Sequence, residues 1–144
     1  MMISSKGRYA LHVMVDLAQH GGEGLVSLKA VAERQGLSLK YLENIVSVLT
    51  HAGLLSGQRG KVGGYRLTRK PEEYPVGEIV GLTEGGLAPV ACLHCGGDGC
   101  EKADTCETLP LWVELNALVS DYLNRVTVAD LVNGTVPPAL AKEL

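Results

Sequence analysis

The sequence has no phenylalanine and a single tryptophan, Trp112, so Leu, Val and Ala must fill most of any core. It also has no apolar run close to the roughly 20 residues that a helix needs to cross a bilayer. Its first residues lack the basic segment and the apolar stretch of a secretory signal. We therefore expect a cytoplasmic protein with no membrane partner.

Sequence patterns typical of catalytic sites are missing as well. There is no glycine-rich nucleotide-binding motif, no Ser/His/Asp arrangement for nucleophilic catalysis and no carboxylate pair for acid–base chemistry. A small redox or iron–sulfur enzyme, the alternative from a different functional class, would also leave the distribution of charge unexplained. We therefore expect a binding protein that is not an enzyme.

Charges of opposite sign are separated along the chain, although the net charge is only -3. Residues 1–70 contain ten Lys and Arg against four Asp and Glu, whereas residues 71–144 contain three against twelve. A basic half followed by an acidic half indicates that the first half meets a polyanion and that the second does not.

Three segments of helical apolar spacing occupy the first third of the chain, and each follows a serine suited to the N-cap position. The predicted helices begin after Ser4 or Ser5, after Ser27 and after Ser38, and they end at Gly21, Gln35 and Gly53. A short turn that contains a glycine, Gly36, joins the second helix to the third. This is the pattern of a helix-turn-helix.

A basic β-hairpin is predicted directly after these helices. Residues 54–58 and 65–68 have the pattern of strands, and the glycine-rich turn between them carries Arg59 and Lys61. A helix-turn-helix followed by such a hairpin is a winged helix, and its glycines let backbone N–H groups approach a phosphate closely. We expect the hairpin to contact DNA, the alternative being a solvated surface hairpin.

The side chains expected to contact DNA lie mainly at the start of the third helix and at the tip of the hairpin. The first turn of a recognition helix reaches phosphates and base edges, and a glutamate there can accept a hydrogen bond from a cytosine amino group. A surface acid paired with a neighbouring side chain is the alternative for that glutamate. The candidate residues are Lys6, Ser38, Lys40, Tyr41, Glu43, Asn44, Arg59 and Lys61.

All four cysteines lie in a glycine-rich segment without periodicity, residues 85–107, which we call the cysteine segment. Their spacing is Cys92-x2-Cys95-x4-Cys100-x5-Cys106. Four thiolates so close together on a loop can converge on one metal center, which would then order the segment. Thiolates suit zinc and iron–sulfur clusters alike, although the last spacing is slightly wide for a zinc knuckle. A redox dithiol or disulfide switch is a third option.

Helices are predicted on both sides of the cysteine segment, over residues 75–84 and from residue 108 onward, with Thr108 as the expected N-cap of the second. The long second one has an apolar seam at 3-4-3-4 spacing, formed by Trp112, Leu115, Val119, Tyr122 and Val126. This seam is wide enough to pack on its own domain and on a partner helix, so we expect a homodimer rather than a monomer with a core helix. Residues 127–130 resemble a capping box that opens a short last helix.

The sequence thus predicts a mainly α-helical fold with a small β-hairpin wing. We expect a winged helix-turn-helix over residues 1–84, a metal or cluster loop over residues 85–107, a dimerisation helix and a short terminal helix over residues 108–133, and a flexible tail over residues 134–144.

Taken together, these motifs resemble the Rrf-type winged-helix transcription regulators. The resemblance runs from residue 3 to about 133. The matching segments are residues 4–10 (SSKGRYA), 35–43 (QGLSLKYLE), 53–54, 59–60, 63–65 (GGY), 76–79 (VGEI), the cysteine segment, 111–112 and 127–131. The resemblance implies a homodimer with crossing C-terminal helices, a double-stranded DNA site of two half-sites, and a cluster loop near the recognition helix.

The resemblance also implies a set of cluster ligands. The last two cysteines match those of the cluster-binding members, and the first family cysteine corresponds to either of the other two. A family histidine ligand is replaced here by Leu109, and the aspartate ligand of the nitric-oxide sensors is replaced by Arg8. The expected ligands of a [2Fe–2S] or [4Fe–4S] cluster are therefore Cys92, Cys95, Cys100 and Cys106.

The function expected from these observations is regulation of transcription in response to redox, iron or nitric-oxide status, sensed through an iron–sulfur cluster. The alternative is a zinc-bound or cluster-free regulator of the same family, in which the cysteines are structural or act as a thiol switch.

Overall fold

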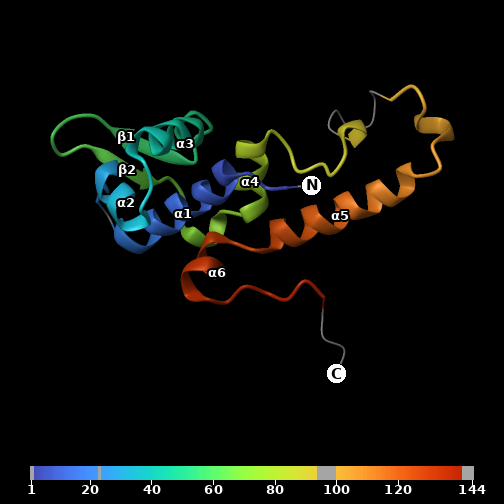
Figure 1. The fold of residues 1–144 in the computed structure, drawn as a ribbon. Coiled ribbons are helices and arrows are strands. Elements are labelled where there is room, and N and C mark those ends of the chain that lie inside the picture. The colour runs from blue at the N-terminus through green and yellow to red at the C-terminus, as the bar shows by residue number, and fades with distance from the viewer. Residues whose placement is uncertain (1, 23, 94–99, 141–144) are drawn as a thin grey trace.

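The computed structural model describes residues 2–22, 24–93 and 100–140, which form a helical body, a two-stranded hairpin and a long projecting helix (Figure 1). The α-helices are α1 (Ser5–His20), α2 (Leu28–Gln35), α3 (Leu39–His51), α4 (Val76–Glu84), α5 (Leu109–Arg125) and α6 (Val128–Asn133). The strands are β1 (Leu55–Gln58) and β2 (Gly64–Leu67), and short 3-10 turns are η1 (Pro71–Glu73), η2 (Ala91–Leu93) and η3 (Ala103–Thr105). The predicted fold class, a mainly α-helical winged helix, is confirmed.

The helix-turn-helix forms where the sequence predicts it. The hydroxyl of Ser27 accepts a hydrogen bond from the N–H of Ala30, and that of Ser38 accepts one from the N–H of Tyr41. Gly36 ends α2 in the left-handed conformation with φ 65°, which residues with a side chain rarely adopt. These local signals set the turn and so fix where α3 begins.

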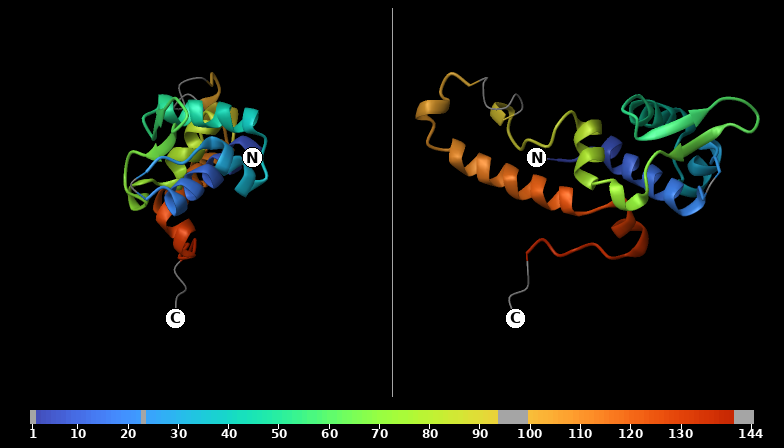
Figure 2. Two further views of the ribbon diagram at one scale, coloured as in Figure 1. Left: turned by 90° about the vertical axis from the view of Figure 1, so that its left-hand side faces the viewer. Right: turned by 180° about the vertical axis from the view of Figure 1, so that it is seen from behind.

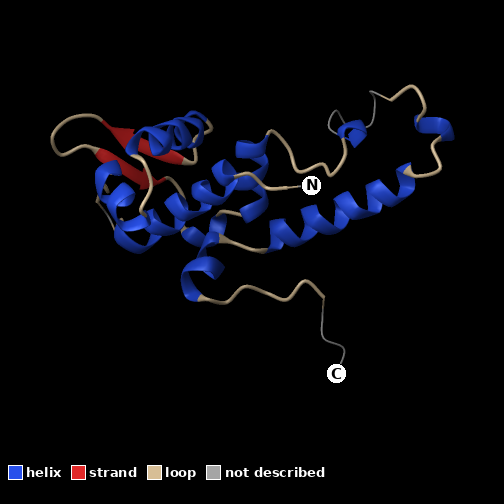
Figure 3. Ribbon diagram, viewed as in Figure 1, coloured by secondary structure: helices blue, strands red, loops and turns tan. Residues whose placement is uncertain are grey.

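The wing is an antiparallel hairpin in which Leu55 pairs with Leu67 and Gln58 with Gly64 (Figure 3). Val26 adds a short bridge to β2, because its N–H and carbonyl group both bond to the backbone of Tyr65 at 2.9 and 2.8 Å. The sequence did not indicate this bridge. It ties the segment before α2 to the wing.

One aliphatic core lies beneath the helix-turn-helix. It takes buried side chains from α1, α2, α3, β1 and α4, together with Tyr74 and Val128. The last helix, α6, therefore packs into the core of the winged helix although the long α5 separates the two in sequence. Backbone bonds from Val76 to Val126 and from Val128 to Tyr74, at 2.8 and 3.0 Å, bring the two segments together.

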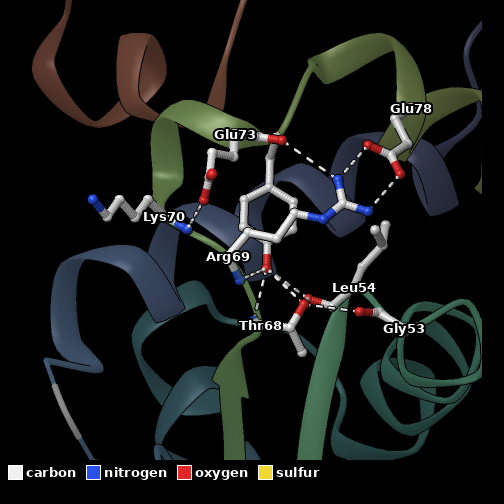
Figure 4. Close-up of polar contacts among 8 residues, drawn as sticks. Gly53, Leu54, Thr68, Arg69, Lys70, Glu73 and Glu78 are labelled. Carbon is white, nitrogen blue, oxygen red and sulfur yellow. Dashed lines mark hydrogen bonds and ion pairs between the residues drawn. The ribbon is translucent and has the colours of Figure 1, made fainter.

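The buried hydroxyl of Tyr74 holds the base of the wing (Figure 4). It accepts hydrogen bonds from the N–H groups of Thr68 and Arg69 and donates one to the carbonyl oxygen of Leu54, each at 2.8 Å. The guanidinium group of Arg69 lies over the tyrosine ring and pairs with Glu78. One side chain thus satisfies backbone groups at the ends of both strands.

A buried carboxylate joins α1 to α2. The side chain of Asp16 is 0% exposed and accepts two hydrogen bonds from Arg34, at 3.0 and 2.6 Å, and one from Gln35 at 2.9 Å. Burial raises the pKa of Asp16, but these hydrogen bonds and the charges of Arg34 and His20 outweigh burial and hold the pKa below its ordinary value. The interaction fixes the orientation of the helix that precedes the recognition helix.

Helix α5 projects from the body, and none of its side chains is buried (Figure 2). Four members of the predicted seam are half-buried, while Leu111 and Leu118 are 60% and 63% exposed. No helix in the described part of the chain is both long and apolar enough to span a membrane. A large apolar surface of α5 thus lacks cover within a single chain.

The prediction that Thr108 caps α5 is wrong. Thr108 has a helical backbone conformation, φ -93° and ψ -14°, and its hydroxyl makes no cap bond. It lies instead 3.4 Å from the sulfur of Cys106. The capping box of α6 is confirmed, since the side chains of Thr127 and Asp130 bond to each other's backbone N–H.

The residues after α6 turn back along α5. The hydroxyl of Tyr122 donates to the carbonyl oxygen of Pro137, and Arg125 donates to that of Ala139, both at 3.0 Å. The guanidinium group of Arg125 also lies over the ring of Tyr122. Two side chains at the end of α5 therefore hold the described part of the C-terminal segment.

Replacing Asp16 by Asn should lower the free energy of unfolding by about 2–3 kcal/mol, because the change leaves the guanidinium group of Arg34 without its buried partner. Urea denaturation at neutral pH measures this loss. The matched control is Glu78→Gln, which removes an ion pair whose two side chains are 37% and 38% exposed and should cost less than about 1 kcal/mol.

The effect of Asp16→Asn should also depend on pH. Folding lowers the pKa of Asp16, so the ionised carboxylate stabilises the folded protein. This contribution to the free energy of unfolding is complete at pH values above the ordinary pKa of an aspartate. It is lost as the pH falls through the lowered pKa of the folded protein. The difference in stability between wild type and variant should therefore be largest near neutral pH and shrink in acid. A difference that stays constant down to strong acid would contradict this assignment.

Candidate nucleic-acid interface and cysteine site

Helix α3 presents one buried and one polar face. Four apolar side chains, at positions 42, 45, 46 and 49, are buried in the core. On the opposite face Lys40, Glu43 and Asn44 are exposed, and Glu43 makes no ion pair with Lys40 in the described part of the chain. Three of the predicted DNA-contacting residues thus share one solvent-facing surface.

Two other predicted contacts also have structural roles. The hydroxyl of Ser38 caps α3, and the half-buried ring of Tyr41 packs edge-on against Tyr9 with ring centers 5.6 Å apart. The hydroxyl of Tyr41 lies 3.4 Å from that of Ser5. These contacts set the first turn of α3 on the first two turns of α1.

The tip of the wing carries the predicted basic pair. Arg59 and Lys61 are both exposed, and Gly60 between them has φ 118°, which favours glycine. Figure 1 shows this turn projecting from the body near α3. The remaining candidate, Lys6, is half-buried in the first turn of α1. The polar face of α3 and the wing tip therefore make up the candidate nucleic-acid interface.

Three of the four predicted metal ligands lie in the described part of the cysteine segment. Cys92, Cys100 and Cys106 are free, half-buried thiols, whereas Cys95 lies outside the described residues. Among the residues that are described, no three His, Cys, Asp or Glu side chains converge on one metal position. The donors themselves are soft sulfur ligands, which fit an iron–sulfur cluster and zinc.

Cys106 lies just before the first turn of α5. Hydrogen bonds lower the pKa of the Cys106 thiol. The largest effect comes from the hydroxyl of Thr108, and smaller ones come from the backbone N–H groups of Thr108 and Leu109. These donors outweigh the small effect of burial, and a helix N-terminus also favours negative charge. The thiolate, the form that binds metal, is thereby favoured at this position.

The described parts of the cysteine segment run from the end of α4 toward the N-terminal end of α5, on the side of the molecule away from the wing (Figures 1 and 2). The nearness to the recognition helix implied by the family resemblance is therefore not present within one chain. The two are separated because α5 projects from the body and the segment joins its far end.

A contact that sequence reasoning missed joins the base of this segment to α1. The N–H and the hydroxyl of Ser4 both donate to one carboxylate oxygen of Glu84, at 3.0 and 2.6 Å. A side chain in place of Gly7 would meet the same carboxylate. Glu84 is the last residue of α4, directly before the cysteine segment, so this contact links that segment to the helix that supports α3.

Comparison with known proteins identifies close relatives. Residues 3–134 match the model of the Rrf2 family, described as an iron-dependent transcriptional regulator. The chain is 41% identical to the HTH-type transcriptional regulator IscR of Serratia proteamaculans, over 92% of this chain and 80% of that protein.

Solved structures give the same result. The structure of CymR, the global cysteine regulator of B. subtilis, is 38% identical with a TM-score of 0.75, covering 94% of this chain and 98% of that one. That of T. potens IscR is 39% identical with a TM-score of 0.73, covering 93% and 88%. The chain therefore belongs to the Rrf2 family: it is a DNA-binding transcriptional regulator with a winged-helix fold and not an enzyme.

Proposed function

We propose that this regulator acts in the cytoplasm and senses redox, iron or nitric-oxide status through an iron–sulfur cluster. The ligands would be Cys92, Cys95, Cys100 and Cys106, the full set of cysteines in the chain. The observation that carries the proposal is this concentration of thiols between α4 and α5, with Cys106 favoured as thiolate by the start of α5. The iron dependence in the description of the family supports it.

A cluster at this position would supply an iron–thiolate center that oxidants and iron scarcity can dismantle. The residues of the chain determine how its presence or loss would alter the fold. Cys106 is fixed to the first turn of α5, and Cys92 lies in the 3-10 turn η2. Ligands on both sides of the segment would hold η2 and the start of α5 together only while the center is bound.

We propose that the protein binds double-stranded DNA as a homodimer that covers two half-sites. The uncovered apolar surface of α5 supports a two-fold contact between α5 helices, because Leu111 and Leu118, seven residues apart on one face, are 60% and 63% exposed within a single chain. Crossing of two such helices, as in the family resemblance, would carry the cysteine segment of one copy toward the body of its partner.

We further propose that Glu84 couples the cysteine segment to the DNA-reading surface. A rearrangement at residue 85 and beyond would move the Glu84 carboxylate, which holds Ser4 at the start of α1. The next residue, Ser5, contacts Tyr41 in the recognition helix. A path of three hydrogen bonds, two between Ser4 and Glu84 and one between Ser5 and Tyr41, therefore supports two arrangements of α3, each favoured by one state of the center.

A second candidate is a regulator with a zinc-bound or cluster-free cysteine segment that is structural or acts as a thiol switch. The similarity to CymR, the global cysteine regulator of B. subtilis, fits this candidate as well as the first. In this case the DNA-binding half of the chain would be unchanged. The domains proposed from the sequence, residues 1–84, 85–107, 108–133 and 134–144, apply to both candidates.

Protein purified without oxygen should be brown, with visible absorbance from iron–thiolate bonds, and should contain iron and sulfide. Replacing Cys95 by Ser should remove most of this absorbance or make it decay quickly, because one of four ligands is lost. The control is Asp104→Asn, an exposed acid in the same segment. Colourless wild-type protein that contains zinc would favour the second candidate, and an unchanged Cys95→Ser spectrum would contradict the four-cysteine set.

Replacing Leu118 by Glu should raise the dimer dissociation constant at least about tenfold, because a charge would enter the apolar contact between α5 helices. Sedimentation equilibrium measures the constant. The matched control is Leu140→Glu, an equally apolar side chain that is 77% exposed outside α5. A dimer that tolerates both changes alike would show that α5 is not the interface.

Replacing Glu84 by Ala should bring the DNA affinities of the cluster-bound and cluster-free forms closer together. Coupling between two sites amounts to about 1–3 kcal/mol, or roughly 5- to 150-fold in affinity, and the variant should lose most of this ratio. Fluorescence anisotropy with both forms gives the ratio, and Glu78→Gln is the control on the same helix. If the ratio is as large as in wild type, Glu84 is not in the path.

A further inference from the structure

A polar groove of about 540 Å³ lies between the second half of α3 and the wing. Ser47, Thr50 and His51 line it from α3, and Gly57, Gln58 and Arg59 line it from the hairpin. None of the described residues that line the groove is acidic. Of these six, only Arg59 was expected to contact DNA from the sequence.

We propose that this groove binds a phosphate of the DNA backbone, with His51, Gln58 and Ser47 as ligands beside Arg59. The proposal rests on the proposed binding of duplex DNA by α3 and the wing. When α3 lies in a major groove and the wing tip reaches the neighbouring minor groove, the sugar–phosphate strand that separates the two grooves must pass between α3 and the wing. The groove between α3 and the wing lies where this strand would pass.

The lining chemistry suits a phosphate. An imidazole, an amide, a hydroxyl and a guanidinium group all donate hydrogen bonds, and such donors account for most phosphate contacts in protein–DNA complexes. Ser47, His51, Gln58 and Arg59 are all exposed, so each is free to turn toward the strand.

The walls of the groove have two further features. The hydroxyl of Thr50, in the wall of the groove, is buried and has no hydrogen-bond partner in the described part of the chain. Buried hydroxyl groups nearly always have one, so the wall of the groove has a hydrogen-bonding group to spare. Gly57 makes room on the hairpin side for the ring of Tyr65, which also lines the groove, because a Cβ atom there would lie 2.8 Å from that ring.

This contact does not read sequence, so it should add affinity for any duplex and orient α3 for reading bases. The charged or titratable side chains that line the groove from α3 and from the hairpin are His51, Arg59 and Tyr65.

The test uses the full chain and a random-sequence duplex of about 30 base pairs, roughly three helical turns. Anisotropy titrations over a range of salt concentrations give the affinity and its salt dependence. His51→Ala should weaken binding several-fold, because the phosphate loses the imidazole donor. His20→Ala, an exposed histidine on α1, is the matched control.

Gln58→Ala provides a second variant on the hairpin side. It should weaken binding several-fold without changing the salt slope, because an amide is neutral. Gln19→Ala, an exposed glutamine on α1, is its control.

If wild type binds the duplex and both groove variants bind it as tightly as their controls do, the proposed phosphate site is contradicted. The proposed DNA-binding surface of α3 and the wing would not be affected by that result. If wild type fails to bind any duplex even at low salt, the DNA-binding surface itself is wrong, and this site with it.

Discussion

The pair of hydrogen bonds from Ser4 to Glu84 is the contact on which the proposed sensing depends. It joins the last residue before the cysteine segment to the first turn of α1, and α1 in turn supports the recognition helix through Tyr9 and Tyr41. At its other end α1 holds α2 through the buried carboxylate of Asp16. Both helices of the helix-turn-helix are therefore fixed to α1, so any displacement of α1 would reach the DNA-reading surface.

The two halves of the chain differ in how completely they fold on themselves. The winged helix has a closed aliphatic core, to which α6 contributes Val128. Helix α5 and the cysteine segment have no buried apolar side chain in the part that the structure describes. A segment with so little core of its own is ordered by what binds it, which a metal center and a second copy of the chain would both do.

Local sequence signals predicted much of the fold. The N-caps Ser27 and Ser38, the turn at Gly36 and the capping box at Thr127 each depend on residues a few positions apart, and each is confirmed. The failed cap at Thr108 shows the limit of such signals. The same residue type can cap a helix or bond to a neighbouring sulfur, and the backbone conformation that decides between them is set by the preceding loop.

Long-range contacts were beyond the sequence pattern. Nothing local marks Asp16 as the partner of Arg34, Tyr74 as the tie of the wing, or Glu84 as the acceptor for Ser4, because each pair is joined only by the tertiary fold. The basic and polar residues of the candidate interface were predictable by type and position. The groove between α3 and the wing was not, since it exists only once the hairpin folds beside the helix.

The most direct measurement is a DNA-binding titration of one oxygen-free preparation of wild-type protein, before and after its metal center is removed by a chelator. If the center and the winged helix are coupled as proposed, the affinity for duplex DNA will change at least about fivefold while the melting curve of the winged helix stays cooperative. An equal affinity in the two states, or a preparation that never contained metal, would contradict the coupling.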